Sequence, residues 1–309
     1  MKDRFWKRQG WRRFWAAFGL TLVGMLPGFA AVWLAAPAPP EPAAERQQGI
    51  PIRLPDESHQ LTLLAAVAGD SPAFVLVRLD AVEETLALAA IPAESVVRTE
   101  GGGVTLAECY EATGPARVAR LLADTLEIPV DRYLAATPES WQAILEDAGP
   151  VRVGLHGALT AAQRQLAGLD EDAESWTVLG AHRFLEHLRG LRDGRLPPQS
   201  TAAARAVLWQ GWARQKLEQL PGLVPGGIRK YSSRILTNLT ATELLSLEQT
   251  LEFLADSQVE PQAGALPGLW NGETGRYEFT DETLTWARQV LGGPEVCIDP
   301  WEQPQPPQA

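Results

Sequence analysis

Residues 72–97 read PAFVLVRLDAVEETLALAAIPAESVV and contain two apolar runs separated by a polar turn. The runs cover Phe74 to Leu79 and Leu86 to Ile91, and the turn between them reads Ala81-Val82-Glu83-Glu84. Short apolar runs bounded by polar residues are typical of β-strands, and this pair predicts a hairpin inside a sheet core. A similar run from Leu61 to Val67 precedes them, so the sequence predicts three consecutive strands.

Helical patterns alternate with strands further along the chain. Residues 115–126 begin with a proline in the first turn and place four aliphatic residues on one face. A short strand is predicted at 132–136, and Thr137 is the expected cap of a helix that Gly149-Pro150 ends. Residues 151–155 alternate between apolar and polar, as a strand does. Strands that alternate with helices predict an α/β domain.

The second half of the chain is mostly helical in pattern. Thr160 with Gln163, and Thr240 with Glu243, have the spacing of capping boxes at helix starts. Apolar residues at 184, 185, 188 and 191 are spaced for one helix face. The pattern as a whole predicts an α/β layered domain with added helices.

The amino-terminal region is basic and then apolar. Residues 1–13 carry six Lys/Arg and one Asp, whereas the 23 residues 14–36 carry no charge. At about 1.5 Å per residue, such a stretch can cross a hydrocarbon core about 30 Å thick. The basic flank precedes the span, so the amino terminus is expected in the cytoplasm and the rest outside. A cleaved signal peptide is the alternative, because small residues follow at 35–38, but its apolar core would be unusually long.

The sequence predicts five parts of one single-pass protein of the cell membrane. A linker rich in Pro, Ala, Glu and Gln precedes one large domain, and no internal repeat is visible. The parts are a cytoplasmic tail at 1–13, a transmembrane helix at 14–36, an extracytoplasmic linker at 37–55, an α/β domain at 56–293 and a Pro-rich tail at 294–309.

Composition excludes several classes of protein. The chain has 309 residues, 45% of them hydrophobic and only two of them Cys, so it is neither disordered nor built on many disulfides. Residues 14–309 keep 21 basic and 37 acidic residues, a net charge of −16, which excludes nucleic acid as an expected partner. Cys109 and Cys297 are predicted to be buried apolar residues, and one long-range bridge between them is the alternative.

Five segments, read in order, resemble the LytR-CpsA-Psr (LCP) family. The members of that family are extracytoplasmic enzymes that transfer polyprenyl-pyrophosphate-linked glycopolymers to the cell wall. The resemblance spans nearly all of the outer domain and rests on the order and spacing of the segments, not on one specific motif. The segments are PAFVLVRLDAVEETLALAAIPAESVV (72–97), TLAECYEATGPARVARLLADTLEIPVDRYLAATPESWQAILEDAGPVRV (105–153), LGAHRFLEHLRGLRDG (179–194), TNLTATELLSL (237–247) and LPGLWNGETGRYEFTDETL (266–284).

The resemblance implies a binding site for a pyrophosphate. Moving such a group requires cations that neutralise phosphate charge and carboxylates that hold Mg²⁺ or accept a proton from the attacking hydroxyl. The family's arginine pair is matched by Arg189 and Arg192, which share a helix face, and Asp193 and Arg195 follow. A solvated arginine-rich helix end is the alternative. Arg205 is a weaker candidate, because it lies out of register with the family's Arg-Gln pair, which falls on alanines here.

Three carboxylates complete the predicted site. After the third strand the family usually has Ile-Pro-Arg and then an acid, where this chain reads Ile91-Pro92-Ala93-Glu94. The arginine is therefore replaced, whereas Glu94 is kept as a candidate catalytic base; an exposed loop acid is the alternative. Asp70 is a candidate catalytic residue and Mg²⁺ ligand, or an ordinary turn aspartate. Asp193 is the other candidate metal ligand.

The resemblance implies an α/β fold with a mixed central β-sheet flanked by helices, in a protein of bacterial cell-envelope assembly. We expect it to bind a polyprenyl (pyro)phosphate-linked glycopolymer in a long apolar cavity beside Arg189 and Arg192. As an LCP-type phosphotransferase it would transfer the polymer to the cell wall, with peptidoglycan as a further partner. The replaced arginines favour the alternative, a catalytically degenerate lipid-binding or scaffold protein of the same fold.

Other motifs do not predict a site. The histidines at 59, 156, 182 and 187 are isolated or five residues apart, so core or surface positions are expected and not a metal centre. Trp209 and Trp212 are three residues apart on a predicted helix and are expected in the core, not in a sugar-binding platform. Gly101–Gly103 lacks a following Lys-Ser/Thr and is interpreted as a flexible turn.

Overall fold

The computed structural model describes residues 54–69, 72–99, 101–155, 158–166, 177–180, 184–185 and 196–292. The chain divides into two units, residues 1–54 and 55–309, and apart from Leu54 the described residues belong to the second. Among these residues, no helix is long and apolar enough to cross a membrane. The transmembrane helix predicted at 14–36 lies outside the described residues.

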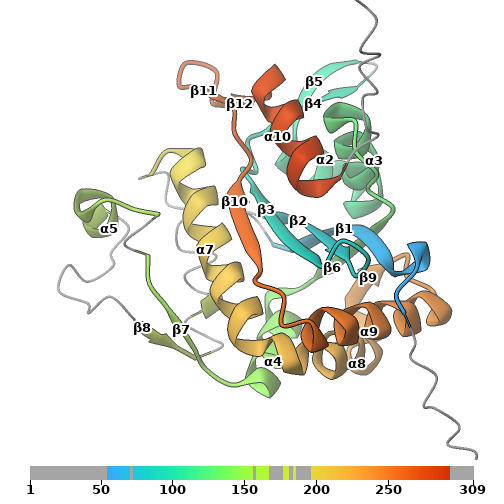
Figure 1. Ribbon diagram of the computed structural model, residues 1–309. Helices are drawn as coiled ribbons and strands as arrows, with labels where there is room; N and C mark the ends of the chain where they lie inside the picture. The colour runs from blue at the N-terminus through green and yellow to red at the C-terminus, as the bar shows by residue number, and fades with distance from the viewer. Residues whose placement is uncertain are drawn as a thin grey trace, which may run out of the picture. The chain divides into compact units, whose positions relative to one another are not determined.

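A six-stranded mixed sheet forms the centre of the second unit (Figure 1). Its strands, in spatial order, are β10 (Gln262–Ala265), β3 (Thr85–Ile91), β2 (Ala73–Asp80), β1 (Gln60–Val67), β6 (Arg132–Ala136) and β9 (Ile235–Thr237). The three strands predicted at the start of the domain are antiparallel neighbours, which confirms the hairpin. β6 runs parallel to β1 and β10 parallel to β3, whereas β9 is antiparallel to β6.

All six strands share one edge of the sheet, called the loop edge below. β1, β3, β6 and β10 end there, and β2 and β9 begin there. The pairing fixes this alignment, because Val67 lies opposite both Ala73 and Ala136, and Ala90 lies opposite Ala265. Segments that leave these strand ends therefore start from the same side of the domain.

Helices cover both faces of the sheet (Figure 1). One face packs against α4 (Pro138–Ala148), α7 (Pro198–Lys216), α8 (Leu220–Lys230) and α9 (Ala241–Asp256), and the other against α2 (Leu106–Thr113), α3 (Pro115–Leu126) and α10 (Asp281–Leu291). Side chains alternate along a strand, so Leu63 and Ala65 belong to the first core, and Leu64 and Ala66 to the second. The predicted α/β fold with a mixed central sheet is confirmed for the described residues.

Short elements surround this centre. They are the strand pairs β4 (Val96–Thr99) with β5 (Gly102–Thr105), β7 (Val151–Val153) with β8 (Thr177–Leu179), and β11 (Leu269–Asn271) with β12 (Arg276–Glu278), the helix α5 (Ala161–Leu166), and the 3-10 turns η1 (Glu57–His59), η2 (Leu217–Gln219) and η3 (Ser232–Arg234). The prediction of a flexible turn at Gly101–Gly103 is wrong for two of these three residues. Gly102 and Gly103 belong to β5, because Gly103 pairs with Arg98 across the hairpin. Pairing between strands overrides weak local β-propensity here.

Helix ends follow the local chemistry that the sequence indicated. α3 has the predicted bounds, and the Thr137 hydroxyl accepts a hydrogen bond from the Ser140 N–H at 3.3 Å at the start of α4. The capping box of Thr240 and Glu243 is present, with distances of 3.3 and 2.8 Å. Cys109 is a free, buried thiol on α2, as a core residue should be, whereas Cys297 lies outside the described residues.

Candidate functional site

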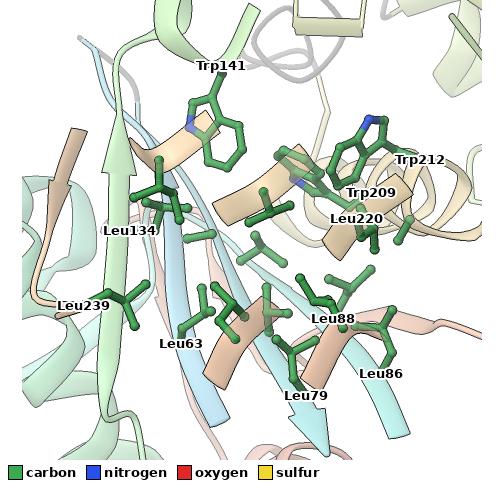
Figure 2. A pocket seen from close by; sticks show the side chains of 18 residues that line it. Leu63, Leu79, Leu86, Leu88, Leu134, Trp141, Trp209, Trp212, Leu220 and Leu239 are labelled. Atoms are coloured by element: carbon green, nitrogen blue, oxygen red, sulfur yellow. The ribbon is translucent and has the colours of Figure 1, made fainter. Parts of the chain in front are cut away.

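An apolar cavity lies between the sheet and the helices α4, α7, α8 and α9 (Figure 2). Its surface is made entirely of apolar atoms. The lining residues are Leu63, Ala65, Val75, Val77, Leu79, Leu86, Leu88, Leu134, Trp141, Trp209, Trp212, Ala213, Leu220, Val224, Ile228, Leu239, Leu247 and Leu251. The strand residues among them are Leu134 of β6 and alternate positions of β1, β2 and β3, so the alternation of the strands builds the sheet side of the cavity.

The cavity is narrow but extended. Its volume is about 90 Å³, whereas apolar cavities of about 150 Å³ stay dry and take up benzene. Along β2 the lining runs from Val75 to Leu79, which spans about 13 Å at about 3.3 Å per residue. A cavity with no polar partner for water suits a hydrocarbon chain, and a longer chain requires the lining side chains to move apart.

Tryptophans gather at one end of the cavity, and Leu79 and Leu86 lie at the other (Figure 2). The Trp141 Nε1–H donates a hydrogen bond to the Ala66 carbonyl at 3.0 Å, next to the end of β1. The Trp209 ring makes edge contacts with the rings of Trp141 and Trp212, at centroid distances of 5.5 and 5.9 Å. The aromatic end of the cavity therefore lies toward the loop edge, and the core positions expected for Trp209 and Trp212 are confirmed.

Arg205 lies on α7 one helical turn before Trp209. Residues four apart share a helix face, so the guanidinium group and the tryptophan ring project to the same side of α7. Arg205 is buried and is engaged in an interaction within the protein. Its neighbours on the helix, Ala202 and Ala206, pack with Ala90 near the end of β3. Arg205 therefore lies on the part of α7 between Trp209 of the cavity and the loop edge.

The segment that carries the predicted arginine pair is flanked on both sides by buried residues of the core around the cavity. Phe184 and Leu185 are buried in the core that surrounds the cavity, and so is Leu196. Between these anchors, the predicted residues Arg189, Arg192, Asp193 and Arg195 lie outside the described residues. Their roles remain predictions.

Glu94 lies in a tight turn at the loop edge. The carbonyls of the four residues Pro92 to Ser95 each accept a backbone hydrogen bond, from the N–H groups of Ser95, Ala107, Tyr277 and Leu106, at 2.8 to 3.1 Å. The Glu94 side chain is half-buried, and its carboxylate has no hydrogen bond or ion pair with the described residues. The turn therefore presents an unpaired carboxylate on a fixed backbone.

Ala93, which stands where the family has arginine, is an apolar core residue here. Its side chain is 8% exposed and belongs to the core on the α2 and α3 side of the sheet, away from the cavity. The alanine that replaces the family's arginine therefore packs in the apolar core.

The described residues contain no group of three or more His, Cys, Asp or Glu side chains that fits a metal ion. Glu94 supplies a carboxylate oxygen of the kind that Mg²⁺ prefers. Asp70 lies outside the described residues, although its neighbours Gly69 and Pro72 flank the loop edge. His59 is buried and bonded to Asp56 within η1, whereas the other three histidines lie outside the described residues.

Solved structures share this arrangement of sheet and helices. B. subtilis TagV has a TM-score of 0.54 and 16% identity, over 76% of this chain and 97% of that one. TagT bound to LIIa-WTA has a TM-score of 0.54 and 15% identity, over 78% and 92%. A proposed transcription regulator from Eubacterium siraeum DSM 15702 has a TM-score of 0.61 and 16% identity, over 80% and 96%. No protein-family model and no curated protein matches the chain.

The domain has the LytR-CpsA-Psr fold. At these identities the likeness establishes the fold alone. The sequence had identified this LCP fold and the strands that build the cavity, but it could not separate cavity-lining residues from ordinary core residues. Both kinds give the same alternation, and only the distance between the sheet and α7, α8 and α9 decides where space is left.

Proposed function

We propose that this protein binds a polyprenyl-phosphate-linked glycopolymer at the outer face of a bacterial membrane and transfers it to the cell wall. The observation that carries the proposal is the wholly apolar cavity, whose aromatic end lies toward the loop edge where Glu94 lies. The prenyl chain would occupy the cavity and the phosphates the loop edge. TagT, which has this fold, has been solved bound to LIIa-WTA.

Arginines would bind the phosphates. Arg205 is one helical turn from the cavity, and Arg189, Arg192 and Arg195 come from the segment that starts beside Trp209. Guanidinium groups fork onto phosphate oxygens and remain charged at all physiological pH values. Several arginines at the end of an apolar cavity suit a ligand that is charged at one end and apolar at the other.

The proposed transfer breaks a pyrophosphate bond. A hydroxyl group of the wall acceptor, for which peptidoglycan is the candidate, attacks the phosphorus that carries the glycopolymer. The P–O bond to the second phosphate breaks, and polyprenyl phosphate leaves. The hydroxyl proton passes to the Glu94 carboxylate, or to Asp70 if that side chain is the base. Mg²⁺ bound by Asp70 and Asp193 would neutralise phosphate charge at this point.

We also propose the membrane arrangement that the sequence predicts. Residues 14–36 would cross the membrane, residues 1–13 would lie in the cytoplasm, and the domain would lie outside. This arrangement places the cavity on the side of the membrane where lipid-linked wall precursors are consumed.

A second candidate is a protein of the same fold that holds lipid-linked intermediates without transferring them. The buried, apolar Ala93 favours it, because an arginine contact to phosphate is missing there. A lost charge-assisted hydrogen bond is worth about 1.5–3 kcal/mol, or roughly tenfold to a hundredfold in rate.

Native mass spectrometry of the full chain in detergent, with and without added polyprenyl pyrophosphate and Mg²⁺, tests the binding. The blocking variant is Ala213→Leu, which adds an apolar side chain to the cavity lining. Ala116→Leu is the matched control, because Ala116 is exposed on α3. We expect lipid on the wild type and on A116L and none on A213L. The variant with both Arg189→Ala and Arg192→Ala should also lose the lipid.

A transfer assay with a lipid-linked glycopolymer then separates the two candidates. Transfer that Glu94→Gln lowers at least tenfold supports the enzyme, and retained lipid without transfer supports the holding protein. Equal lipid binding by the wild type and A213L would show that the cavity is not the lipid site.

A further inference from the structure

A second pocket lies on the other face of the sheet, among β4, β12, the end of α3 and the start of α10. Its volume is about 400 Å³, within the range of about 300–1,000 Å³ that small-molecule sites have. Unlike the cavity, it is lined by polar and apolar atoms in about equal parts. Its lining residues are Val96, Arg98, Asp124, Thr125, Glu127, Arg276, Glu278, Phe279, Thr280, Asp281 and Leu284.

Both signs of charge line this pocket without neutralising one another. Arg98 and Arg276 come from β4 and β12, whereas Asp124 comes from α3 and Glu278 from β12. None of these four side chains makes a hydrogen bond or ion pair within the part of the chain that the structure describes. Glu127, by contrast, is paired with Arg288. Asp281 also lines the pocket, and its carboxylate has no partner among the described residues either. The pocket therefore offers two guanidinium groups and three carboxylates to a ligand, and the charge of Arg276 also acts on Glu108 outside the lining.

Gly103 lies directly against two of the residues that line the pocket. A Cβ atom at this position would lie 2.8 Å from Val96 Cγ1 and 3.9 Å from Arg276 Nη1, and both of those residues line the pocket. Any side chain at position 103 would push into this wall. The glycine run that the sequence analysis interpreted as a turn therefore has a spatial role beside Arg276.

The backbone joins this pocket to the Glu94 turn. β4 begins two residues after Glu94, and the Tyr277 N–H of β12 donates to the Glu94 carbonyl at 3.0 Å. Ser95 and Tyr277 also form an isolated β-bridge. A ligand held by Arg98 and Arg276 would thus contact the same strands that fix the proposed catalytic turn.

We propose that this pocket binds a short zwitterionic peptide. The guanidinium groups of Arg98 and Arg276 bind its carboxylate, and Asp124 and Glu278 bind its ammonium group. Val96, Phe279 and Leu284 contact its apolar side chains. Under the proposed function, the ligand is the peptide part of the wall acceptor, held next to the Glu94 turn. That last step rests on the proposed function, whereas the binding of the peptide does not.

The test uses trialanine and the full chain in detergent, without any lipid donor, and measures the transverse NMR relaxation of the peptide. N-acetylated and C-amidated trialanine each lack one of the two charges. We expect each blocked peptide to bind roughly tenfold to a hundredfold more weakly than the free peptide. Arg98→Gln with Arg276→Gln should weaken binding of the free peptide similarly, and so should Asp124→Asn with Glu278→Gln.

The control variant is Arg120→Gln, which removes an exposed arginine of α3 that does not line the pocket and should leave the affinity unchanged. Gly103→Val should reduce binding although it removes no charge. Equal affinities for free and blocked peptides, or no binding at about ten times a Kd of about 1 mM, would overturn the proposal. No lipid is present in this test. A failure of the peptide to bind would therefore leave the proposed lipid binding untouched, and a failure of lipid binding would leave the peptide site untouched.

Discussion

The ring of Phe184 lies edge-on against the ring of Trp209, with 5.6 Å between their centroids. This contact connects the segment that carries Arg189 and Arg192 to the aromatic end of the cavity. It also makes Trp209 the centre of a cluster of three further aromatic rings, those of Trp141, Phe184 and Trp212.

Replacing Trp209 with alanine should destabilise the domain strongly. Trp209 is 7% exposed, and its removal takes away three ring contacts and enlarges an existing cavity. We expect Trp209→Ala to lower the free energy of unfolding by about 3–5 kcal/mol. Urea denaturation followed by circular dichroism measures it. Trp270→Ala is the control, because Trp270 is 42% exposed on β11 and its loss should cost less than about 1 kcal/mol.

The elements that sequence patterns predicted best are those whose signals are local. Residues 115–126 form a helix with the expected bounds, because a proline starts it and apolar spacing continues through it. The strand at 132–136 and the caps at Thr137 and Thr240 are likewise decided by neighbours in sequence. The folded domain keeps these local conformations because the tertiary structure favours the same ones.

Elements decided by distant pairing were not predicted. β10 reads Gln-Ala-Gly-Ala and has no strand pattern, yet it pairs with β3 because Ala202 and Ala206 of α7 leave room beside Ala90. The second pocket, which Arg98 and Arg276 line, is likewise formed from residues of β4, α3, β12 and α10, which are far apart in sequence. At the candidate site, Glu94 could be found because it follows a predicted strand. The buried position of Ala93 could not, since the family pattern has an arginine there that would bind phosphate.

Restoring the family's arginine at position 93 should not restore a phosphate site. Ala93→Arg would place a guanidinium group in the apolar core on the α2 side, which overpacks that core and buries a charge. We expect a loss of stability of about 1–3 kcal/mol and no gain in lipid binding. Thermal unfolding and native mass spectrometry measure the two effects. Ala112→Arg, at an exposed position of α2, is the control and should unfold like the wild type.

Glu243 should make the domain sensitive to acid. A hydrogen bond from the Thr240 N–H, followed by the Arg132 guanidinium group, lowers the pKa of Glu243 below its ordinary value. A lowered pKa contributes stability above the ordinary value, and this stability is lost as the pH falls through the folded-state pKa. Glu243→Gln should therefore cost about 0.5–1 kcal/mol at neutral pH, because the side chain is partly exposed and screened.

This cost should shrink as the pH falls below about 4.5, the ordinary pKa of the group, where the wild type also loses the charge. Urea unfolding of both proteins between neutral and acidic pH measures the difference. Glu252→Gln, on an exposed face of the same helix, should show no such pH dependence. A Glu243 effect that persists unchanged in acid would mean that shape, and not charge, stabilises the contact with Arg132.

Tyr277 should make the domain sensitive to alkali. Burial raises the pKa of the Tyr277 hydroxyl to about 12, with a smaller effect from the charge of Glu282. The hydroxyl also donates a hydrogen bond to the Leu266 carbonyl at 2.9 Å. A raised pKa contributes stability that is fully present below the unfolded-state value of about 10 and is lost as the pH rises toward about 12.

Tyr277→Phe removes the hydrogen bond together with the titration. At about pH 8 the variant should be less stable than the wild type by about 1 kcal/mol, because the Leu266 carbonyl loses its partner. Above about pH 10 this difference should decrease, since only the wild type must keep a hydroxyl protonated that ionises in the unfolded chain. Urea unfolding at about pH 8 and about pH 11 measures both values. A difference that stays constant over this range would show that Tyr277 ionises equally well in the folded and the unfolded chain, so that water reaches its hydroxyl group in the folded domain.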